Sequence, residues 1–368
     1  MIGFSGLPAP VWAWFEKTAY MMDKARSTRE KMKAFMMYCL RGFWLSGRPG
    51  FVGYVVVLGL LGCTGCGRRS ASRVIGVIPR QASESMWVAE HGGVNQAAAR
   101  QHIGIYWNGP TEERDVEQQV LLVDRAIRNR DVGLILSPSN PFALNTAVQK
   151  SLATGMSVVI VGNPLSLRPE KRLSFVLNDE QEAGRLAAQR IEASLHGRGE
   201  ILIIGIDPLS PGSTERARAF EEAVRRDAPD IHVGDRLEGF FSFGQAELAT
   251  ERAILANPRL SAILSLNTTA TRGAIAAVRT THTSDHIVIV GYDYNFDLLF
   301  LLRRKMLDAL VAQNMREMGK IAVDSVIAED RGTPVAPYSL VKPVLVTREN
   351  IDDESIQGML NMDWRSRP

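Results

Sequence analysis

Short apolar runs alternate with amphipathic stretches along most of the chain after residue 72. Ten of these runs are of strand length and rich in Val, Ile and Leu, which is the pattern of parallel strands buried on both faces. The predicted strands are Val74–Ile78, Ile103–Trp107, Gly133–Leu136, Ser157–Val161, Ser174–Leu177, Glu200–Ile204, His232–Glu238, Leu260–Leu266, Ile287–Gly291 and Ala309–Ala312.

Segments of helix length lie between these runs, with apolar residues repeating at helical spacing on one side. A sustained β-α-β-α alternation predicts parallel sheets with helices on both faces. Ten strands are many for one compact sheet, so we expect two doubly wound α/β lobes with a cleft between them. The predicted helices are Asp115–Asn129, Gln181–Leu195, Thr214–Asp227, Gln245–Ala256, Thr268–Thr281 and Arg316–Glu329.

Polar or aromatic side chains follow nearly every predicted strand. Ligands of such sheets bind at the carboxyl ends of the strands, so these side chains are candidate ligand contacts. Aromatic faces cover the C–H face of a sugar ring, while amide, carboxylate and guanidinium groups pair with its hydroxyls. The pattern therefore indicates a sugar or a sugar-like ligand. The candidates are Arg80, Trp87, Trp107, Asn163, Asp179, Arg216, Asn267, Asp293 and Gln313.

A set of stretches between about residues 74 and 350 carries a family resemblance. They include VIGVIPR, VGLILSPSN, SFVLNDEQEAGRLAA, TERARAF, ILSLNTTATRGA, IVGYD and LVTRENI, in this order. Together they resemble the type I periplasmic binding proteins of the ribose-binding group, which are related to the ligand domain of lactose-repressor-type regulators. The resemblance implies two lobes that are joined by a multi-strand hinge and close on a small polar ligand.

The resemblance also implies roles for single residues. Arg216 corresponds to the arginine of the family's R-x-x-G-F stretch, a bidentate donor to hydroxyls, with Ala219 in place of the glycine. Gly162-Asn163 stands where the ribose binders have an Asp-Arg pair, which argues against ribose itself as the ligand. The other implied positions are Arg80 and Trp87 in the first strand–helix loop, with Trp87 stacking on the ligand, Asp179 before the first crossover, Asn267 after the eighth strand, Asp293 in the G-[FY]-D stretch and Gln313 near a hinge.

The cysteines lie close to the N-terminus. Cys39, Cys63 and Cys66 are the three in the chain, so the body has no disulfide, no cysteine metal site and no cysteine nucleophile. Residues 51–62 are uncharged and too few to span a membrane core, and they are typical of the apolar region of a signal peptide. The junction Leu60–Cys63 resembles the bacterial lipobox, which makes Cys63 the expected lipidation site. A short buried helix with two incidental cysteines is the alternative.

These observations divide the chain into expected parts. The protein is expected to be exported, to lie in the periplasm or cell envelope with a lipid anchor in a membrane, and to be a monomer. The parts are an N-terminal extension with a lipoprotein signal peptide (1–62), a tether (63–72), an N-terminal lobe (73–178 and 314–340), a C-terminal lobe (179–313 and 341–352) and a tail (353–368).

Charge and missing motifs exclude several functions. The net charge of +3 comes without a clustered basic patch, so we expect no nucleic-acid partner. The sequence has no phosphate loop, no G-x-G-x-x-G after a strand and no G-x-S-x-G, and its six histidines lack the spacing of metal ligands. We therefore expect no catalytic residue, no metal and no cofactor, and a binding protein rather than an enzyme.

The favoured function is capture of a sugar or sugar-like molecule in the cleft and its presentation to the permease of an ABC importer. The alternative is a sensory binding lipoprotein that feeds a chemoreceptor or a histidine kinase. A ligand-responsive transcriptional regulator is a remote alternative, because it would need a helix-turn-helix before residue 73. An exported hydrolase would need a nucleophile and a base at the strand ends, where amides and an arginine predominate.

Overall fold

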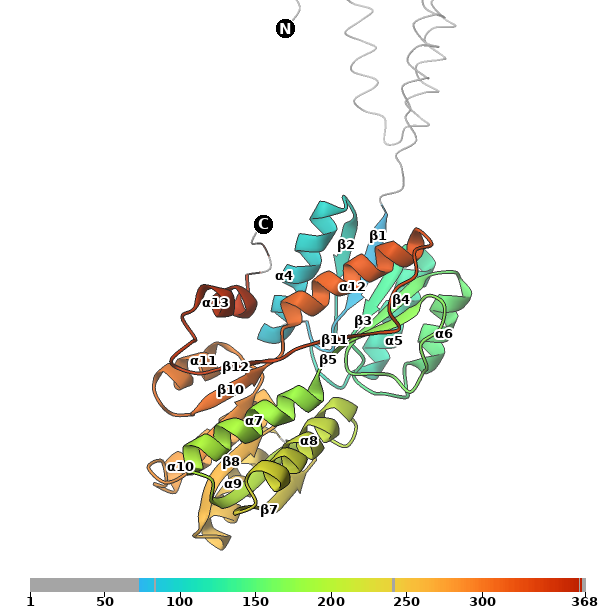
Figure 1. Cartoon of the computed structure of the whole chain (residues 1–368). Helices are drawn as coiled ribbons and strands as arrows, with labels where there is room; N and C mark the ends of the chain where they lie inside the picture. Colours follow the sequence, from blue (N-terminus) through green and yellow to red (C-terminus); the bar gives the residue numbers. More distant parts are fainter. Residues whose placement is uncertain (1–72, 83, 240–241, 364, 366–368) are drawn as a thin grey trace, which may run out of the picture. The chain divides into compact units, whose positions relative to one another are not determined.

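The computed structural model describes residues 73–82, 84–239, 242–363 and 365. They form two α/β lobes, each built on a six-stranded sheet (Figure 1). The two-lobed, doubly wound fold predicted from the sequence is confirmed.

The N-terminal lobe has a sheet of order β11-β5-β4-β3-β1-β2, in which every pair is parallel. Helices α4 and α12 pack together on one face of this sheet, and α5 and α6 cover the other (Figure 1). The elements of this lobe are β1 (Val74–Ile78), α4 (Ser85–Arg100), β2 (Gly104–Trp107), α5 (Val116–Asn129), β3 (Gly133–Leu136), α6 (Asn145–Ala153), β4 (Ser157–Gly162), β5 (Leu173–Asn178), α12 (Met315–Asp330) and β11 (Tyr338–Val341).

The C-terminal lobe has a sheet of order β12-β10-β9-β8-β6-β7, parallel except for the β10–β12 pair. The pairs α7–α8 and α9–α10 cover it. Its elements are α7 (Glu180–Leu195), β6 (Gly199–Ile206), α8 (Pro211–Asp227), β7 (Ile231–Glu238), α9 (Phe243–Ala256), β8 (Leu260–Ser265), α10 (Thr268–Thr280), β9 (Val288–Tyr292), α11 (Phe296–Arg303), β10 (Ala309–Ala312) and β12 (Val344–Val346).

All ten predicted strands are present within two residues of their expected bounds. The two short strands β11 and β12 and the helices α4, α6 and α11 were not expected. The segment predicted as a tail contains a further helix, α13 (Glu354–Leu360), whose apolar residues are buried. Tyr294, between β9 and α11 of the C-terminal lobe, donates a hydrogen bond of 3.5 Å to the carbonyl of Met359 in this helix.

Helix α4 was not predicted because glycines interrupt its helical pattern. These glycines lie where α4 packs closely against α12. A Cβ atom at Gly93 would overlap the backbone carbonyl of Arg316 at the start of α12. A Cβ atom at Gly319 would lie 2.5 Å from the carbonyl oxygen of Glu90. The two helices therefore approach closely only because both lack side chains at these points.

The predicted signal peptide, the lipidation site Cys63 and the tether lie outside the described residues. Among the helices that the structure describes, none combines the length and the apolar composition that a membrane crossing requires.

Glu90 in α4 places a carboxyl group inside the apolar core of the N-terminal lobe. The side chain is fully buried, and neither of its oxygens has a hydrogen-bond partner among the described residues. Burial raises the pKa of Glu90 from an ordinary 4.5 to about 8, because an unpaired carboxylate is poorly stabilised in apolar surroundings. The folded protein therefore holds Glu90 protonated at neutral pH.

We predict that Glu90 makes the fold less stable as the pH rises. Between about pH 4.5 and about pH 8 the unfolded chain releases this proton while the folded chain keeps it, so the free energy of unfolding falls by up to about 1.4 kcal/mol per pH unit. Glu90→Gln cannot ionise. Its unfolding free energy, measured by urea denaturation over the same range, should fall less steeply than that of the wild type.

The matched control is Glu117→Gln, an exposed residue on α5, which should keep the wild-type slope. Equal slopes for the wild type and Glu90→Gln would show that Glu90 is not a buried neutral acid.

Candidate functional site

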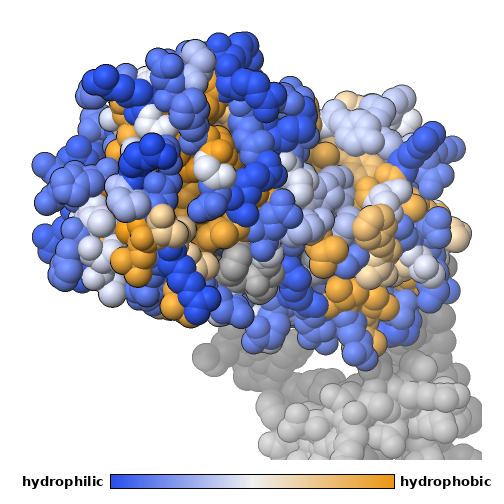
Figure 2. Space-filling view, turned by 90° about the horizontal axis from the view of Figure 1, so that it is seen from below, coloured by the Kyte–Doolittle hydropathy of each residue, from blue (hydrophilic) through white to orange (hydrophobic). Residues whose placement is uncertain are grey.

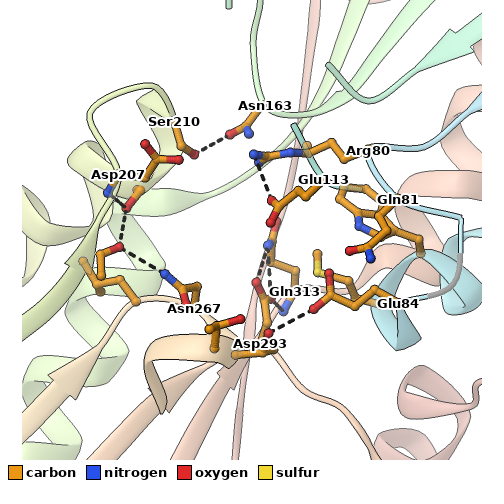
Figure 3. A pocket seen from close by; sticks show the side chains of 18 of the residues that line it. Arg80, Gln81, Glu84, Glu113, Asn163, Asp207, Ser210, Asn267, Asp293 and Gln313 are labelled. Carbon is orange, nitrogen blue, oxygen red and sulfur yellow. Dashed lines mark hydrogen bonds and ion pairs between the residues drawn. The ribbon is translucent and has the colours of Figure 1, made fainter. Parts of the chain in front are cut away.

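A cavity of about 130 Å³ lies between the two lobes, where the carboxyl ends of strands from both sheets meet (Figure 3). The N-terminal lobe contributes residues that follow β1, β2 and β4, and the C-terminal lobe contributes residues that follow β6, β8, β9 and β10. Seven of the nine predicted ligand contacts line it: Arg80, Trp87, Asn163, Arg216, Asn267, Asp293 and Gln313.

Side-chain hydrogen bonds connect the two lobes across the cleft, so the structure represents a closed form. The bond between Ser210 and Asn163 and the bond made by Glu84 lie on opposite sides of the cavity (Figure 3). The bonds run from Arg114 Nη2 to Asp207 Oδ2, from Thr268 Oγ1 to Glu84 Oε1 and from Ser210 Oγ to Asn163 Oδ1, each at 2.9 Å.

Asp293 and Gln313 form one wall of the cavity. Asp293 follows β9 with a φ of 62°, in the left-handed region, which Asp tolerates better than most residues. The amide of Gln313, directly after β10, donates to both carboxylate oxygens of Asp293 at 3.1 and 3.0 Å. Burial raises the pKa of Asp293 to about 7, although the nearby Arg216 guanidinium and the Gln313 hydrogen bond lower it. The Asp293 carboxyl is thus fixed in place and close to its titration point at neutral pH.

Arg216 in α8 forms a second wall and binds mainly within its own lobe. Its Nε and Nη2 donate to the two oxygens of Glu180 at 2.9 and 2.7 Å, and its Nη1 donates to the carbonyl of Leu266 at 3.1 Å. The guanidinium carbon lies 3.6 Å from the ring centroid of Tyr292, whose hydroxyl donates to Glu180 at 2.9 Å. The paired donors that the sequence assigned to ligand hydroxyls therefore bind Glu180 in this structure.

The N-terminal lobe contributes Arg80, Glu84 and Trp87 to the cavity. Arg80 Nη2 lies 2.9 Å from Glu113 Oε1, and the Arg80 side chain is almost completely buried. Burial and the charge of Glu113 both raise the pKa of Glu84. The Arg80 Nε and Trp87 Nε1 donors are buried without a hydrogen-bond partner among the described residues. Unpaired buried donors are costly, so both are suited to accepting groups of a ligand.

The side-chain amide of Asn267 is held in place by hydrogen bonds to two backbone groups. Its Oδ1 accepts a hydrogen bond of 2.8 Å from the amide of Ala270, which caps α10. Its Nδ2 donates to the carbonyl of Gly205 at 3.3 Å. Gly205 has a φ of 87°, and a Cβ atom there would lie 2.8 Å from Asn267 Nδ2, so this position requires glycine.

Two predicted contacts, Trp107 and Asp179, do not line the cavity. Trp107 ends the edge strand β2, and its ring stacks on His91 of α4 with centroids 4.2 Å apart. Asp179 Oδ1 accepts a hydrogen bond of 3.0 Å from the amide of Glu182 and so caps α7. The neighbouring residue, Glu180, lines the cavity instead.

The sequence prediction missed most of the acidic groups of the site. Asp207 directly follows β6 and Glu180 lies two residues after β5, so the strand-end rule could have included them. Glu84 and Glu113 lie several residues beyond β1 and β2, where nothing in the sequence marks them as cavity residues. The missed polar side chains in the lining are Gln81, Glu84, Glu113, Glu180, Asp207, Ser210, Ser213, Thr268 and Thr269.

The polar groups that line the site in the described part of the chain are suited to hydrogen bonding with a polar ligand. No group of three or more His, Cys, Asp and Glu side chains in that part is arranged to hold a metal ion. No histidine or cysteine is among the described residues that line the cavity. Chemically, the described lining offers carboxylates, two guanidinium groups, amides, hydroxyls and one indole for binding.

Comparison with known proteins agrees with this architecture. A family model described as a periplasmic binding protein domain matches residues 75–333. The D-ribose/D-allose-binding protein of Pseudomonas aeruginosa is 26% identical over 190 residues, which cover 50% of this chain and 59% of that protein. The ribose import binding protein of Bacillus subtilis is 24% identical over 213 residues, which cover 58% of this chain and 68% of that protein.

Among solved structures, a carbohydrate transporter solute-binding protein of Agrobacterium radiobacter in complex with D-arabinose has a similar fold. Its TM-score is 0.72 at 21% identity, and the match covers 79% of this chain and all of that one. These relatives are named as binding proteins and none of them as an enzyme, in agreement with the sequence-based expectation. The chain belongs to the periplasmic binding protein family and has its type I fold.

Proposed function

We propose that the chain is a solute-binding protein that captures one sugar or sugar-like molecule between its two lobes. The observation that carries this proposal is the closed cavity, which both lobes line with polar side chains and Trp87. A cavity of about 150 Å³ holds one benzene ring, so a cavity of about 130 Å³ suits a single ring rather than an oligosaccharide.

Closure of the lobes would couple binding to recognition by a partner. The chain passes between the two sheets after β5, after β10 and between β11 and β12, and these connections would act as the hinge. Ligand contacts residues of both lobes only when the cleft is closed, so binding shifts the population toward the closed form.

The partner that we propose is the permease of an ABC importer. The names of the relatives, an import binding protein and a carbohydrate transporter solute-binding protein, support this role. We also propose that the protein works as a monomer in the periplasm or cell envelope, anchored through lipid on Cys63. On the face shown in Figure 2, apolar side chains lie in several groups among polar ones.

We predict that a cognate monosaccharide stabilises the protein against heat. At about one hundred times its dissociation constant, a ligand stabilises the native state by about 2.7 kcal/mol, which raises the melting temperature by several degrees. Thermal unfolding against a panel of monosaccharides and polyols measures this shift. Trp87→Leu should abolish it, because Trp87 lines the cavity, and Trp107→Leu should preserve it, because Trp107 lies outside.

Each variant is compared with its own melting temperature without ligand, so a loss of stability does not obscure the loss of binding. The absence of a shift with every compound in the panel would contradict a sugar-binding function.

We predict a smaller effect from the cross-cleft ion pair between Arg114 and Asp207. The Arg114 side chain is 38% exposed, so solvent screens the pair and its contribution to closure is about 0.2–1 kcal/mol. Arg114→Ala should therefore weaken binding of the best compound from the panel by up to about fivefold, as measured by calorimetry. The control Arg218→Ala removes two ion pairs within α8, with Glu215 and Glu222, and should leave the affinity unchanged. A loss as large as that of Trp87→Leu would show that Arg114 contacts the ligand directly.

A further inference from the structure

The cavity holds more acidic than basic groups. Its described lining includes the carboxyl groups of Glu84, Glu113, Glu180, Asp207 and Asp293. Its guanidinium groups are those of Arg80 and Arg216. The lining therefore carries an excess of carboxyl groups, and a neutral sugar would not offset it.

Three of these five carboxyl groups form ion pairs with arginine side chains. Arg80 pairs with Glu113 at 2.9 Å, and Arg216 pairs with Glu180 at 2.7 Å. Asp207 pairs with Arg114, which comes from the opposite lobe, at 2.9 Å.

Glu84 and Asp293 are the two that remain. Within the described residues, neither has a Lys, Arg or His nitrogen within 4.0 Å. The hydroxyl of Thr268 donates to Glu84 at 2.9 Å, and the amide of Gln313 donates to Asp293 at 3.1 and 3.0 Å, so their partners are neutral. The two residues come from different lobes and lie on the same side of the cavity (Figure 3).

Closure without a ligand brings these two acids together at a cost. Burial is the largest cause that raises the pKa of both. For Asp293, the Arg216 charge and the Gln313 hydrogen bond lower the pKa, and the charges of Glu180 and Glu84 raise it. For Glu84, the charge of Glu113 raises the pKa, and the Thr268 hydrogen bond and the Arg80 charge lower it. Two carboxylates in a poorly solvated site repel each other unless a proton or a cation lies near them.

The hydrogen-bond donors of the cavity are mostly used within the protein. Asn267 Nδ2 binds Gly205, Gln313 Nε2 binds Asp293, and the Arg216 guanidinium binds Glu180 and Leu266. The groups that remain available to a ligand are therefore mainly carboxylate oxygens, which accept hydrogen bonds. It fits a ligand that brings several donors and a positive charge, and an ammonium group has three donors and no acceptor.

We propose that the ligand is a cationic sugar derivative, an amino sugar or an amino polyol, whose ammonium group binds between Glu84 and Asp293. This rests on the proposed function and specifies its ligand class. The ring packs beside Trp87, and the ligand oxygens accept from the unpaired Arg80 Nε and Trp87 Nε1. The ammonium group bridges one carboxylate from each lobe, so it replaces repulsion across the closed cleft with two charge-assisted hydrogen bonds.

Calorimetry of the purified full chain with matched sugars tests the proposal. Each set contains the same ring with a hydroxyl, an amine or an acetylated amine: D-glucose, D-glucosamine and N-acetyl-D-glucosamine, and the corresponding galactose set. Sorbitol and glucamine form a linear pair. In at least one set the amine should bind about tenfold or more tighter than both neutral forms, because hydrogen bonds to charged groups exceed neutral ones by this much.

Two variants of near-identical shape locate the ammonium group. Glu84→Gln and Asp293→Asn should each reduce the preference for the amine over its hydroxyl parent by about tenfold. The readout is the ratio of the two affinities measured on the same variant, so a loss that affects both forms alike leaves the ratio unchanged. The control Glu117→Gln, exposed on α5, should retain the full preference.

The outcomes separate the ligand class from the function. Tighter binding of the hydroxyl form than of its amine in every set that binds would overturn the proposal and leave the sugar-binding function intact. A preference for the amine that survives both variants would overturn the assignment to Glu84 and Asp293. No binding by any member of any set would overturn the proposal together with the sugar-binding function.

Discussion

The ion pair between Arg216 and Glu180 is the interaction on which the geometry of the cleft depends. Both side chains are about nine-tenths buried, and the pair is completed by the Tyr292 ring and hydroxyl. Tyr292 OH also accepts a hydrogen bond of 2.8 Å from Asn178, the last residue of β5. The pair thus connects the start of α7, helix α8, strand β9 and the first crossover between the lobes. Removal of one partner from such a buried pair leaves the other charge unpaired, which typically costs 3–5 kcal/mol.

The charged groups of Arg216 and Glu180 are paired with each other, so these side chains form a rigid wall of the cavity. The movement that accompanies ligand binding is then the closure of the two lobes on each other. The cross-cleft bonds of Glu84, Asn163 and Asp207 favour closure. Each contributes little, because a typical hydrogen bond adds about 0.5–1.5 kcal/mol and solvent screens the half-exposed Arg114. Repulsion between Glu84 and Asp293 opposes closure. A ligand changes the balance of open and closed forms only through contacts that differ between them, and the meeting of these two carboxylates is such a contact.

The sequence predicted the sheets well because buried parallel strands are continuous apolar runs. It missed α4 because Gly92 and Gly93 interrupt the helical pattern. These glycines make room for Arg316 of α12, more than two hundred residues away in the chain. It missed β11 and β12 because strands of three or four residues at a sheet edge carry too little pattern. The same limit applies to Glu90, whose position on α4 gives no sign that its carboxyl is enclosed.

The candidate site was predictable at strand ends and not in the loops beyond them. Asn267, Asp293 and Gln313 directly follow β8, β9 and β10 or lie one residue later, so parallel strand geometry brings them to one edge. Trp107 also ends a strand, but β2 is an edge strand and its side chain packs on α4 instead. The pairing of Arg216 with Glu180, 36 residues apart, could not be read from either residue alone.

The contacts of the cavity explain the effect of Gly162-Asn163, which stands where the ribose binders have an Asp-Arg pair. Gly162 and Asn163 remove an acid and a base together, and they leave the N-terminal lobe to contribute Arg80, Glu84 and Glu113. Arg80 neutralises Glu113, so the net contribution of this lobe is the charge of Glu84. On the other lobe, Arg216 pairs with Glu180, and Asp207 pairs with Arg114 across the cleft. Asp293 is the carboxyl group of that lobe's lining without an ion-pair partner among the described residues. Each lobe thus brings one carboxylate without a cation to the same cavity, and the group that belongs between them is a cation.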